Sequence, residues 1–180
     1  MKNLFFLLLF VYSISIHSQV AIGKNSITNA SVSLEFGNIA GDTSTQRGII
    51  LPWSNSTTAV ENAGVVTGTL IYDTSDKKVK YYKDTYGTPI WFDLSPNSGS
   101  VDTSLQSSLT DNPEAKVSIG NPTSTPGILV LEDTTKAMIL PLVDKYSSVV
   151  NPTPGMMVYD LSNDMFCVFN GTVWSFWKGN

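Results

Sequence analysis

The hydrophobic pattern of the chain begins with an almost unbroken apolar run over residues 4–16, behind a single positive charge at Lys2. A bilayer-spanning helix needs about 20 apolar residues, whereas the central region of a secretory signal peptide needs about 7 to 15. The run is 13 residues long and fits the second case. It predicts a signal peptide over residues 1–18, cleaved between Ser18 and Gln19, and a secreted or cell-surface protein, with the periplasm as the alternative location.

Beyond this leader, five short blocks recur twice in the same order. They are VAIG at 20–23 with VSIG at 117–120, SLE at 33–35 with VLE at 130–132, RGIILP at 47–52 with KAMILP at 136–141, GTLIYD at 68–73 with GMMVYD at 155–160, and GT followed by tryptophan at 87–91 and 171–174. The spacing between the copies falls from 97 residues to 89 and then 87. Such shortening is expected where surface loops vary and strands are kept. The sequence therefore predicts two tandem modules, at 19–94 and 115–180.

The segment between the copies, residues 95–114, is polar. Its large apolar residues are Val101, Leu105 and Leu109, too few to form a core of their own. We expect a polar linker here. Because Leu105 and Leu109 stand four residues apart, one short helix remains the alternative to irregular chain.

Each copy ends in short apolar stretches that alternate with turn residues. In the first copy, residues 70–72, 79–82 and 90–92 are separated by the turns at 73–76 and 84–87. Asp, Ser and Gly favour such turns. The pattern predicts a three-stranded antiparallel meander at the end of each module and an all-β fold.

The two faces of these meanders differ in character. A gap-free alignment of the copies puts Val79 opposite Phe166 and Tyr81 opposite Val168, so these residues should face inward. The outward positions are Lys78, Lys80 and Tyr82 in the first copy but Met165, Cys167 and Phe169 in the second. We therefore expect the second meander to be covered on both faces and the first to be solvated on one. Because one small module cannot cover a second apolar face, Met165, Cys167 and Phe169 form a candidate self-association face.

The composition excludes several functions. Charged residues make up 14% of the chain and the net charge is −4, which argues against nucleic-acid binding. The only histidine, His17, lies in the predicted leader, so the mature chain would lack the base of a Ser/His/Asp or Cys/His site. Cys167 is the only cysteine and cannot form an internal disulfide. We predict no catalytic residues, no cofactor and no metal site.

Carboxylates offer the remaining polar chemistry. The clusters are Asp73 with Asp76, and Asp160 with Asn163 and Asp164. Neither has the spacing of a calcium-binding EF-hand loop, and such residues commonly cap tight turns. A small hydrolase that uses carboxylates is kept as the least favoured hypothesis, because general acid–base chemistry would have to rest on few residue types.

Four tryptophans could contribute to sugar binding. Trp91 and Trp174 occupy repeat positions and are expected to close the meanders, which leaves Trp53 and Trp177 as candidate ligand-stacking residues. A carbohydrate-binding module that uses these rings, with a surface glycan as partner, is therefore the alternative function.

The order of the repeated blocks resembles that of the short repeat modules in secreted and surface proteins of Bacteroidetes and in phage-tail-fibre-like proteins. The residues that carry the resemblance are Ile22, Gly23, Leu34, Glu35, Gly48, Pro52, Gly68, Tyr72 and Trp91 in the first copy, and Ile119, Gly120, Leu131, Glu132, Pro141, Gly155, Tyr159, Asn170, Gly171, Thr172 and Trp174 in the second. The resemblance implies structural motifs and, from the tail-fibre relatives, assembly as a trimer.

These observations together favour a secreted or cell-surface, non-enzymatic structural or adhesive protein that presents surface and self-associates, in the manner of a fibre or an adhesin. The expected partners are further copies of the chain, with a trimer among the possible assemblies. We expect no nucleic-acid partner, and no membrane span in the mature chain.

Overall fold

The computed structural model describes residues 19–37, 46–104, 106–110, 112, 114–121 and 123–179. Strands dominate these residues, and their helical structure consists of α2 (Thr57–Asn62) and the 3-10 turn η2 (Tyr146–Ser148). The all-β fold class predicted from the sequence is confirmed. The predicted signal peptide lies outside the described residues.

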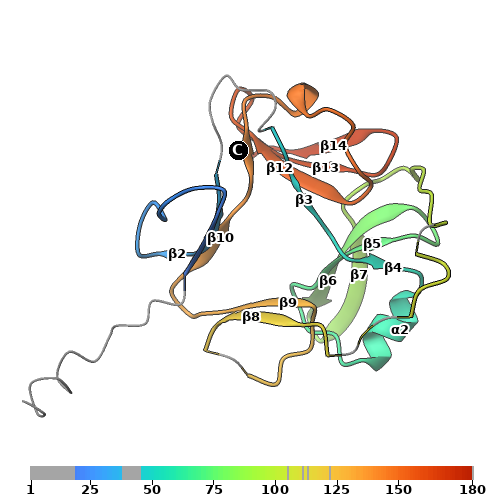
Figure 1. The fold of residues 1–180 in the computed structure, drawn as a ribbon. Coiled ribbons are helices and arrows are strands. Elements are labelled where there is room, and N and C mark those ends of the chain that lie inside the picture. The colour runs from blue at the N-terminus through green and yellow to red at the C-terminus, as the bar shows by residue number, and fades with distance from the viewer. Residues whose placement is uncertain are drawn as a thin grey trace, which may run out of the picture.

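The strands of the described ranges form four sheets. The first contains β1 (Val20–Ile22), β2 (Val32–Phe36) and β10 (Ala137–Ile139); the second contains β3 (Ile49–Ile50), β11 (Leu142–Val143), β12 (Met156–Asp160), β13 (Met165–Phe169) and β14 (Trp174–Trp177); the third contains β4 (Trp53–Ser54), β5 (Leu70–Asp73), β6 (Lys78–Thr85) and β7 (Thr88–Asp93); and the fourth contains β8 (Val117–Gly120) and β9 (Leu129–Glu132). Figure 1 shows the chain passing along β3, beside β12 of the second sheet, and on into β4 of the third.

Both predicted meanders are present. Strands β5, β6 and β7 pair consecutively and antiparallel, as do β12, β13 and β14. The registers repeat as well, because Leu70 pairs with Tyr81 in the first meander and the equivalent Met157 pairs with Val168 in the second. The sequence repeat is therefore also a structural repeat.

A short parallel strand borders each meander in the same way. Trp53 on β4 pairs with Tyr72, and the equivalent Leu142 on β11 pairs with Tyr159. Just before these strands, the carbonyl groups of Pro52 and Pro141 each accept a hydrogen bond of 2.9 Å from the backbone N–H of Tyr72 and Tyr159 respectively. Proline lacks an N–H but keeps its carbonyl, so it can end the preceding block and still bond to the next strand.

Strands also cross between the two repeats. β3, from the first repeat, pairs antiparallel with β12 of the second, where Ile50 lies opposite Met156. β10, from the second repeat, pairs in parallel with β2 of the first, where Met138 lies opposite Leu34. Each repeat thus contributes a strand to a sheet of the other, and hydrogen-bonded strand pairing holds the two repeats together.

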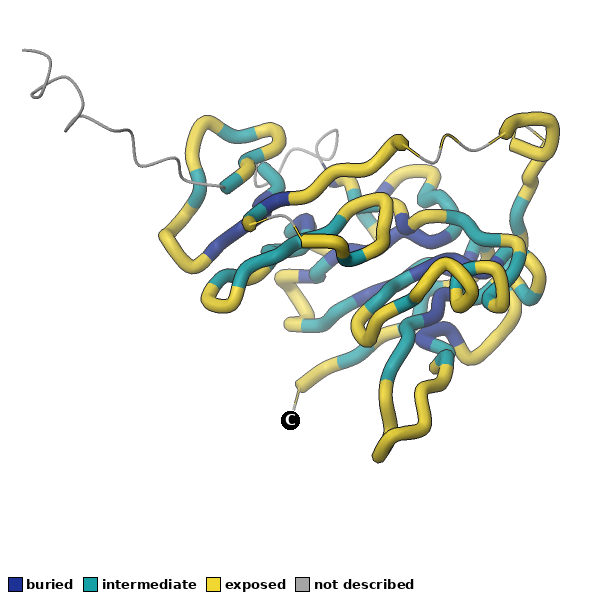
Figure 2. The backbone as a smooth tube through the Cα atoms, turned by 90° about the horizontal axis from the view of Figure 1, so that it is seen from below, coloured by how far each residue is buried: buried dark blue, intermediate teal, exposed yellow. Residues whose placement is uncertain are grey.

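One hydrophobic core lies between the two meanders. Val79 on β6 and Val168 on β13 are fully buried in it, with Tyr81 and Phe166 packed against its edge. The inward face predicted for these residues is confirmed. Figure 2 shows buried segments running along the strands that face one another, while the turns at the periphery are exposed. Both repeats therefore fold around a shared core.

A second, smaller core covers the other face of the second meander. Met165, Cys167 and Phe169 pack there with Val143, Tyr146, Val149 and Trp174, among others. The prediction that the second meander is covered on both faces is confirmed. The cover comes from β11 and η2 of the same chain, which sequence alternation could not indicate.

The corresponding face of the first meander is polar, but it is less solvated than the sequence suggested. Lys80 is buried, and its ammonium group lies 2.5 Å from Asp76 and 2.9 Å from Asp93. Burial alone would lower the pKa of Lys80, but these carboxylates raise it above its usual value. Asp73, at 3.9 Å, is a third acidic neighbour. The expectation of a solvated lysine was wrong because these three carboxylates allow its charge to be buried.

The polar segment between the repeats contacts both of them. The backbone N–H of Gly99 donates to the carbonyl of Lys77 at 2.9 Å, and the Asn170 side chain donates to the carbonyl of Asn97 at 2.7 Å. Leu105, on which the alternative of a short helix depended, lies outside the described residues. On either side of it, Ser104 and residues 106–108 lie in turns, and the backbone N–H of Ser107 donates to the carbonyl of Thr103 at 2.9 Å.

Candidate self-association site

The junction between the repeats is built around Tyr72 on β5. Its side chain is 0% exposed, and its hydroxyl donates to the carbonyl of Asn170 at 2.9 Å. Burial raises the pKa of Tyr72 to about 12, with a further contribution from the charges of Asp76 and Asp73. The phenol is therefore a neutral donor that links the first repeat to the turn after β13.

Gly155 and Trp53 complete this junction. A Cβ at Gly155 would lie 2.9 Å from the Cβ of Tyr72, and the residue has φ +82°, which side chains rarely adopt. The Trp53 ring lies 6.0 Å from that of Tyr72, and its Nε1 donates to the carbonyl of Pro154 at 2.9 Å. Glycine at position 155 is thus required both by its φ and by the close approach of Tyr72.

The asparagine of the Asn-Gly-Thr motif ties three segments together. Asn170 is fully buried, and its Oδ1 accepts from the backbone N–H groups of Thr172 and Val173 at 2.9 Å. Its carbonyl accepts the hydrogen bond from the Tyr72 hydroxyl, and its side-chain N–H donates to the carbonyl of Asn97. Sequence reasoning identified the motif but not these partners, because no local pattern shows which distant groups a buried amide meets.

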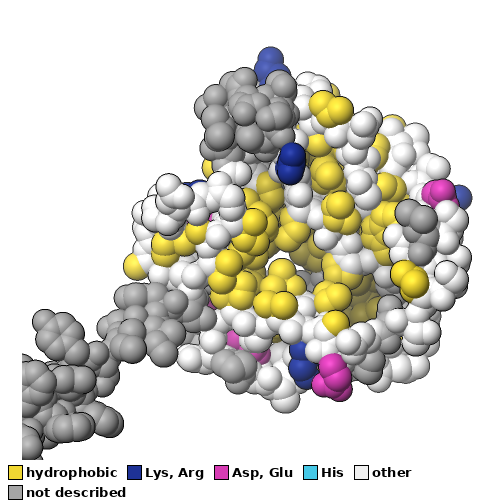
Figure 3. Space-filling view, in the orientation of Figure 1, with side chains coloured by type: hydrophobic (Ala, Val, Ile, Leu, Met, Phe, Trp, Pro, Cys, Tyr) yellow, Lys and Arg dark blue, Asp and Glu magenta, His cyan; other side chains and the backbone are white. Residues whose placement is uncertain are grey.

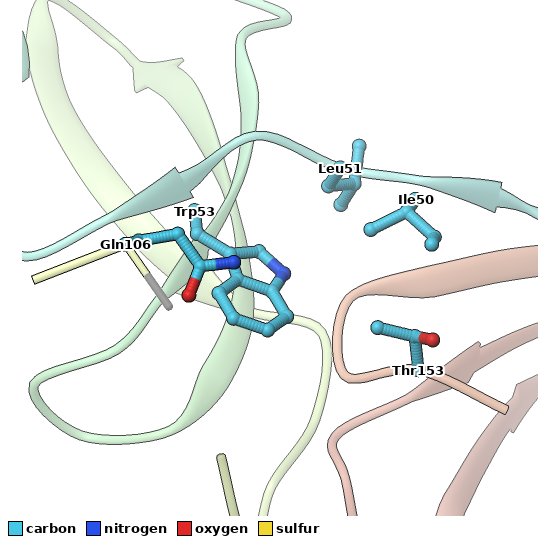
Figure 4. A pocket seen from close by; sticks show the side chains of 5 residues that line it. All are labelled: Ile50, Leu51, Trp53, Gln106 and Thr153. Carbon is cyan, nitrogen blue, oxygen red and sulfur yellow. The ribbon is translucent and has the colours of Figure 1, made fainter. Parts of the chain in front are cut away.

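The two candidate ligand-stacking tryptophans lie at the edge of the main core. Trp177 packs on Phe166 at a centroid distance of 5.9 Å. Trp53 borders a shallow hollow of about 390 Å³ together with Ile50, Leu51, Gln106 and Thr153. In Figure 4 the Trp53 ring extends toward this hollow, between the first repeat and the loop that carries Thr153. Of the two rings, Trp53 borders the open space.

The candidate self-association face is covered within the chain. Cys167 is 0% exposed, and Met165 and Phe169 are partly buried against Val143 and Tyr146. Burial raises the pKa of the Cys167 thiol to about 11, and the nearby charge of Asp160 adds to the shift. Cys167 therefore has no surface to offer to a second copy, and its thiol stays protonated at neutral pH.

The acidic turns are held by bonds within the fold. Burial would raise the pKa of Asp160, but hydrogen bonds from the backbone of Tyr146 and from Asn163 lower it below its usual value. In the first repeat, Asp73 accepts from the backbone and the hydroxyl of Ser75. Within the described ranges, no three acidic, histidine or cysteine side chains are grouped so as to hold a metal ion. Asp73 and Asp160 thus hold turns, as the sequence suggested for the two clusters, whereas Asp76 pairs with Lys80.

The Leu-Glu blocks on β2 and β9 hold their preceding loops in equivalent ways. Glu35 accepts from the backbone N–H of Thr28 at 2.7 Å and pairs with Lys24, while Glu132 accepts from the backbone N–H of Thr123 at 2.8 Å. Hydrogen bonds from Thr123 lower the pKa of Glu132 to about 2. The glutamate of this block is thus a loop anchor in both repeats.

The two Leu-Glu strands differ in their surroundings. β2 lies between β1 and β10, and its residues Val32 to Glu35 are all buried. β9 pairs with β8 alone in the described part of the chain, and its Leu129 is 40% exposed. An apolar strand with one unpaired edge is a ready site for pairing with another chain.

Apolar side chains also gather beside this edge. Figure 3 shows hydrophobic groups around a hollow in the region of β10, β9 and β3. Several large apolar residues on or next to these strands are exposed, including Ile50, Ile128 and Leu129. Soluble monomers rarely leave such patches uncovered, and larger ones mark interaction sites.

Residues 116–179 match the family model described as "Phage tail like trimerisation region". The match spans the second repeat, from β8 to β14, and so includes the exposed β9 edge. This part of the chain is similar to a region of a fibre-like, self-associating structural protein, and the predicted relationship to phage-tail-fibre-like proteins is supported. The comparisons with curated proteins and with solved structures found no match.

Among the described residues, no helix has the length and hydrophobicity that a membrane crossing requires.

Proposed function

We propose that this protein is a secreted or cell-surface structural protein whose chains assemble with one another, as a trimer, into a fibre-like or adhesive element. The observation that carries the proposal is the match of the second repeat to a phage-tail-like trimerisation region. Strand β9, with one unpaired edge in the described part of the chain and an exposed Leu129, lies within the matched residues and supplies a surface of the required kind. The leader predicted at residues 1–18 supports export, and the resemblance to Bacteroidetes repeat modules supports a surface location.

The proposed role is non-enzymatic. Two of the groups that could have supplied catalytic chemistry are engaged within the fold: Asp160 holds η2 and the following turn, and the Cys167 thiol is buried. A chain that lacks histidine after cleavage of the leader would have few bases for proton transfer.

The mass of the mature protein tests the assembly. We expect residues 19–180 to elute as one species with three times the mass of a single chain when measured by light scattering, over a wide range of protein concentrations. A species that stays monomeric up to the highest soluble concentration would contradict the proposal.

Carbohydrate binding is the second candidate, and the position of Trp53 beside the hollow supports it. Sugar rings stack on aromatic faces, and the Gln106 amide at the same hollow could hydrogen-bond to hydroxyl groups. A glycan array followed by tryptophan fluorescence quenching tests this role. Quenching that persists in Gln106→Ala and Thr153→Arg would exclude binding at this hollow.

A further inference from the structure

We propose that the chains associate head to tail, by continuing between molecules the strand exchange that joins the two repeats within one molecule. In this arrangement β9 of one chain pairs with β3 of the next, and β10 of the first chain pairs with β5 of the next. The inference rests on the proposed self-association and specifies the surfaces that carry it.

The exchange within one chain supplies the pattern. Strand β3 of the first repeat pairs with the edge of β12 in the second repeat, and β10 of the second repeat pairs with the edge of β2 in the first. β10 is the repeat equivalent of β3, and β2 is the repeat equivalent of β9. Suppose that the second repeat of one chain packs on the first repeat of the next chain as the first repeat packs on the second within one chain. Then β10 of the first chain would pair with β5 of the next, and β9 of the first chain would pair with β3 of the next.

Both of these positions are vacant in the described part of one chain. β9 pairs with β8 alone, while β2 has partners on both edges. On β12, β3 occupies the edge at Met156 and Met157, and β11 follows it along the same strand. On the edge of β5 opposite β6, β4 occupies the equivalent of the β11 position, and no described strand pairs with Thr69 and Leu70 on that edge.

The local backbone is already shaped for this second pairing. At Met156, which β3 contacts, the N–H bonds to the carbonyl of Thr153 at 3.0 Å; at the equivalent Thr69, the N–H bonds to the carbonyl of Val66 at 3.2 Å. The same turn therefore precedes both edges, although only one of them has a strand beside it.

Three pairs of repeat-equivalent residues differ in burial in the direction that the exchange requires, whereas the outer-strand pair Ile22 and Ile119, 50% and 7% exposed, differs in the opposite direction. Where the exchange occurs within the chain, residues are buried: Leu34 is 2%, Leu51 6% and Tyr72 0% exposed. Their equivalents, where the exchange would need a second chain, are only partly buried: Leu131, Leu140 and Tyr159. The blocks are similar in sequence, so the missing neighbour rather than side-chain chemistry accounts for the difference.

The glycines that open the β5 and β12 blocks give a further comparison. Gly155 has Tyr72 within 2.9 Å of the position that a Cβ would take. At the equivalent Gly68, no described atom lies within 4 Å of that position. In the head-to-tail arrangement Gly68 of one chain would receive Tyr159 of another, as Gly155 receives Tyr72.

The registers within the chain fix the contacts expected between chains. Transfer of the Met156–Ile50 pair places Ile139 of one chain opposite Thr69 of the next. Transfer of the Glu35–Ile139 pair places Glu132 opposite Ile50. The outer strands are less regular, because Val20 pairs with Leu34 whereas Ile119 pairs with Leu131, a shift of two residues that leaves each side chain on its original face.

An interface of this kind joins two different surfaces of the same molecule. Such heterologous contacts form a ring if the rotation closes and a filament if it does not. The match of the second repeat to a trimerisation region favours closure at three chains. Six repeats would then follow one another around a closed ring.

Disulfide trapping between differently tagged chains tests the pairing. Thr69→Cys is placed in one chain and Ile139→Cys in the other, both with Cys167→Ala, and the chains are refolded together and oxidised. We expect a disulfide-linked dimer that contains both tags, and no linked species from either variant alone. Ile50→Cys with Met156→Cys in one chain is the matched control and should link within that chain.

Three results separate the possibilities. A trimer by light scattering with no mixed disulfide, or with self-linking of a single variant, would overturn the head-to-tail pairing and leave the proposed trimer intact. A monomeric mature protein would remove both. Should the cysteine variants fail to fold, Leu131→Lys on the β9 edge is expected to lower the assembly mass to that of one chain with an unchanged circular dichroism spectrum, whereas Val117→Lys on the outer strand β8 should leave the mass unchanged. A trimeric Leu131→Lys variant would also overturn the pairing.

Discussion

Equivalent positions in the two repeats carry different chemistry where their surroundings differ. Lys80 on β6 lies opposite Asp93 and bonds to it, whereas the equivalent Cys167 on β13 lies opposite Phe176. One repeat fills its outer face with ion pairs and the other with apolar contacts. The backbone pairing is the same in both, so this fold tolerates either solution provided that buried charge is paired.

Gly155 and Gly68 provide a matched pair of substitutions. Gly155→Ala is expected to lower the free energy of unfolding by about 2 to 3 kcal/mol. The alanine must adopt the strained φ of +82°, and its Cβ also contacts Tyr72. In dissociated chains, Gly68→Ala should lower this free energy by only about 1 kcal/mol, since its φ of +94° is also strained but the space is open. Urea unfolding at high dilution measures both, and equal effects would contradict the Tyr72 contact.

Tyr72 and Cys167 make stability sensitive to alkaline pH. Their pKa values in the folded chain are about 12 and about 11, above the ordinary 10.0 and 9.0. The unfolded chain therefore loses these protons first, so the stabilisation is complete below about pH 9 and is lost as pH rises toward 12. Urea midpoints across this range should fall with pH, and the fall should be smaller in Tyr72→Phe with Cys167→Ala. An equal fall in that double variant would assign the effect to other groups.

At the scale of elements, the meanders could be predicted from the sequence and the exchange could not. Alternation along β5, β6 and β13 indicates which residues face inward, because side chains on a strand alternate between faces. The partners of β3 and β10 lie about 100 residues away in the chain, and nothing local to a two- or three-residue strand specifies such a partner. The same limit applies to the bonds of Asn170 and to the cover that η2 provides for Cys167.

The attachment of η2 to β12 depends on one carboxylate. Asp160 accepts from the backbone N–H of Tyr146 at 3.0 Å and from Asn163, and its pKa is lowered. Its contribution is present above the ordinary pKa of the unfolded chain and is lost as pH falls through the lower folded value. Asp160→Asn should therefore lower stability at neutral pH by about 1 to 2 kcal/mol and weaken the acid dependence.

Unfolding measured at several pH values between 3 and 7 provides the check. Asp84→Asn is the matched control, because Asp84 caps an exposed turn through the backbone N–H of Gly87 and holds no second element. If Asp160→Asn left both the neutral stability and its acid dependence unchanged, the role of this carboxylate as the anchor of η2 would be refuted.

At the scale of the whole molecule, the low charge of the chain agrees with a surface that other copies cover in part. Only 14% of residues are charged, so apolar groups such as Ile50 and Leu129 are not separated by a dense layer of charge. Net charge far from zero keeps proteins monomeric, and the modest −4 of this chain opposes association only weakly. Assembly would remove the β9 edge from solvent and so reduce the risk of uncontrolled strand pairing.

Thermal stability should therefore depend on protein concentration. Association stabilises the folded chain by mass action, so the melting temperature of a trimer rises as the concentration increases. We expect the mature protein to show this rise in calorimetry over a hundredfold range of concentration. Leu131→Lys should melt at the same temperature at every concentration, because it places a charge on the apolar β9 edge without altering either core. Val117→Lys should behave like the unaltered protein. A melting temperature that does not change with concentration, in a sample that light scattering shows to be dissociating, would mean that assembly contributes nothing to the fold and that the exposed β9 edge is not its contact.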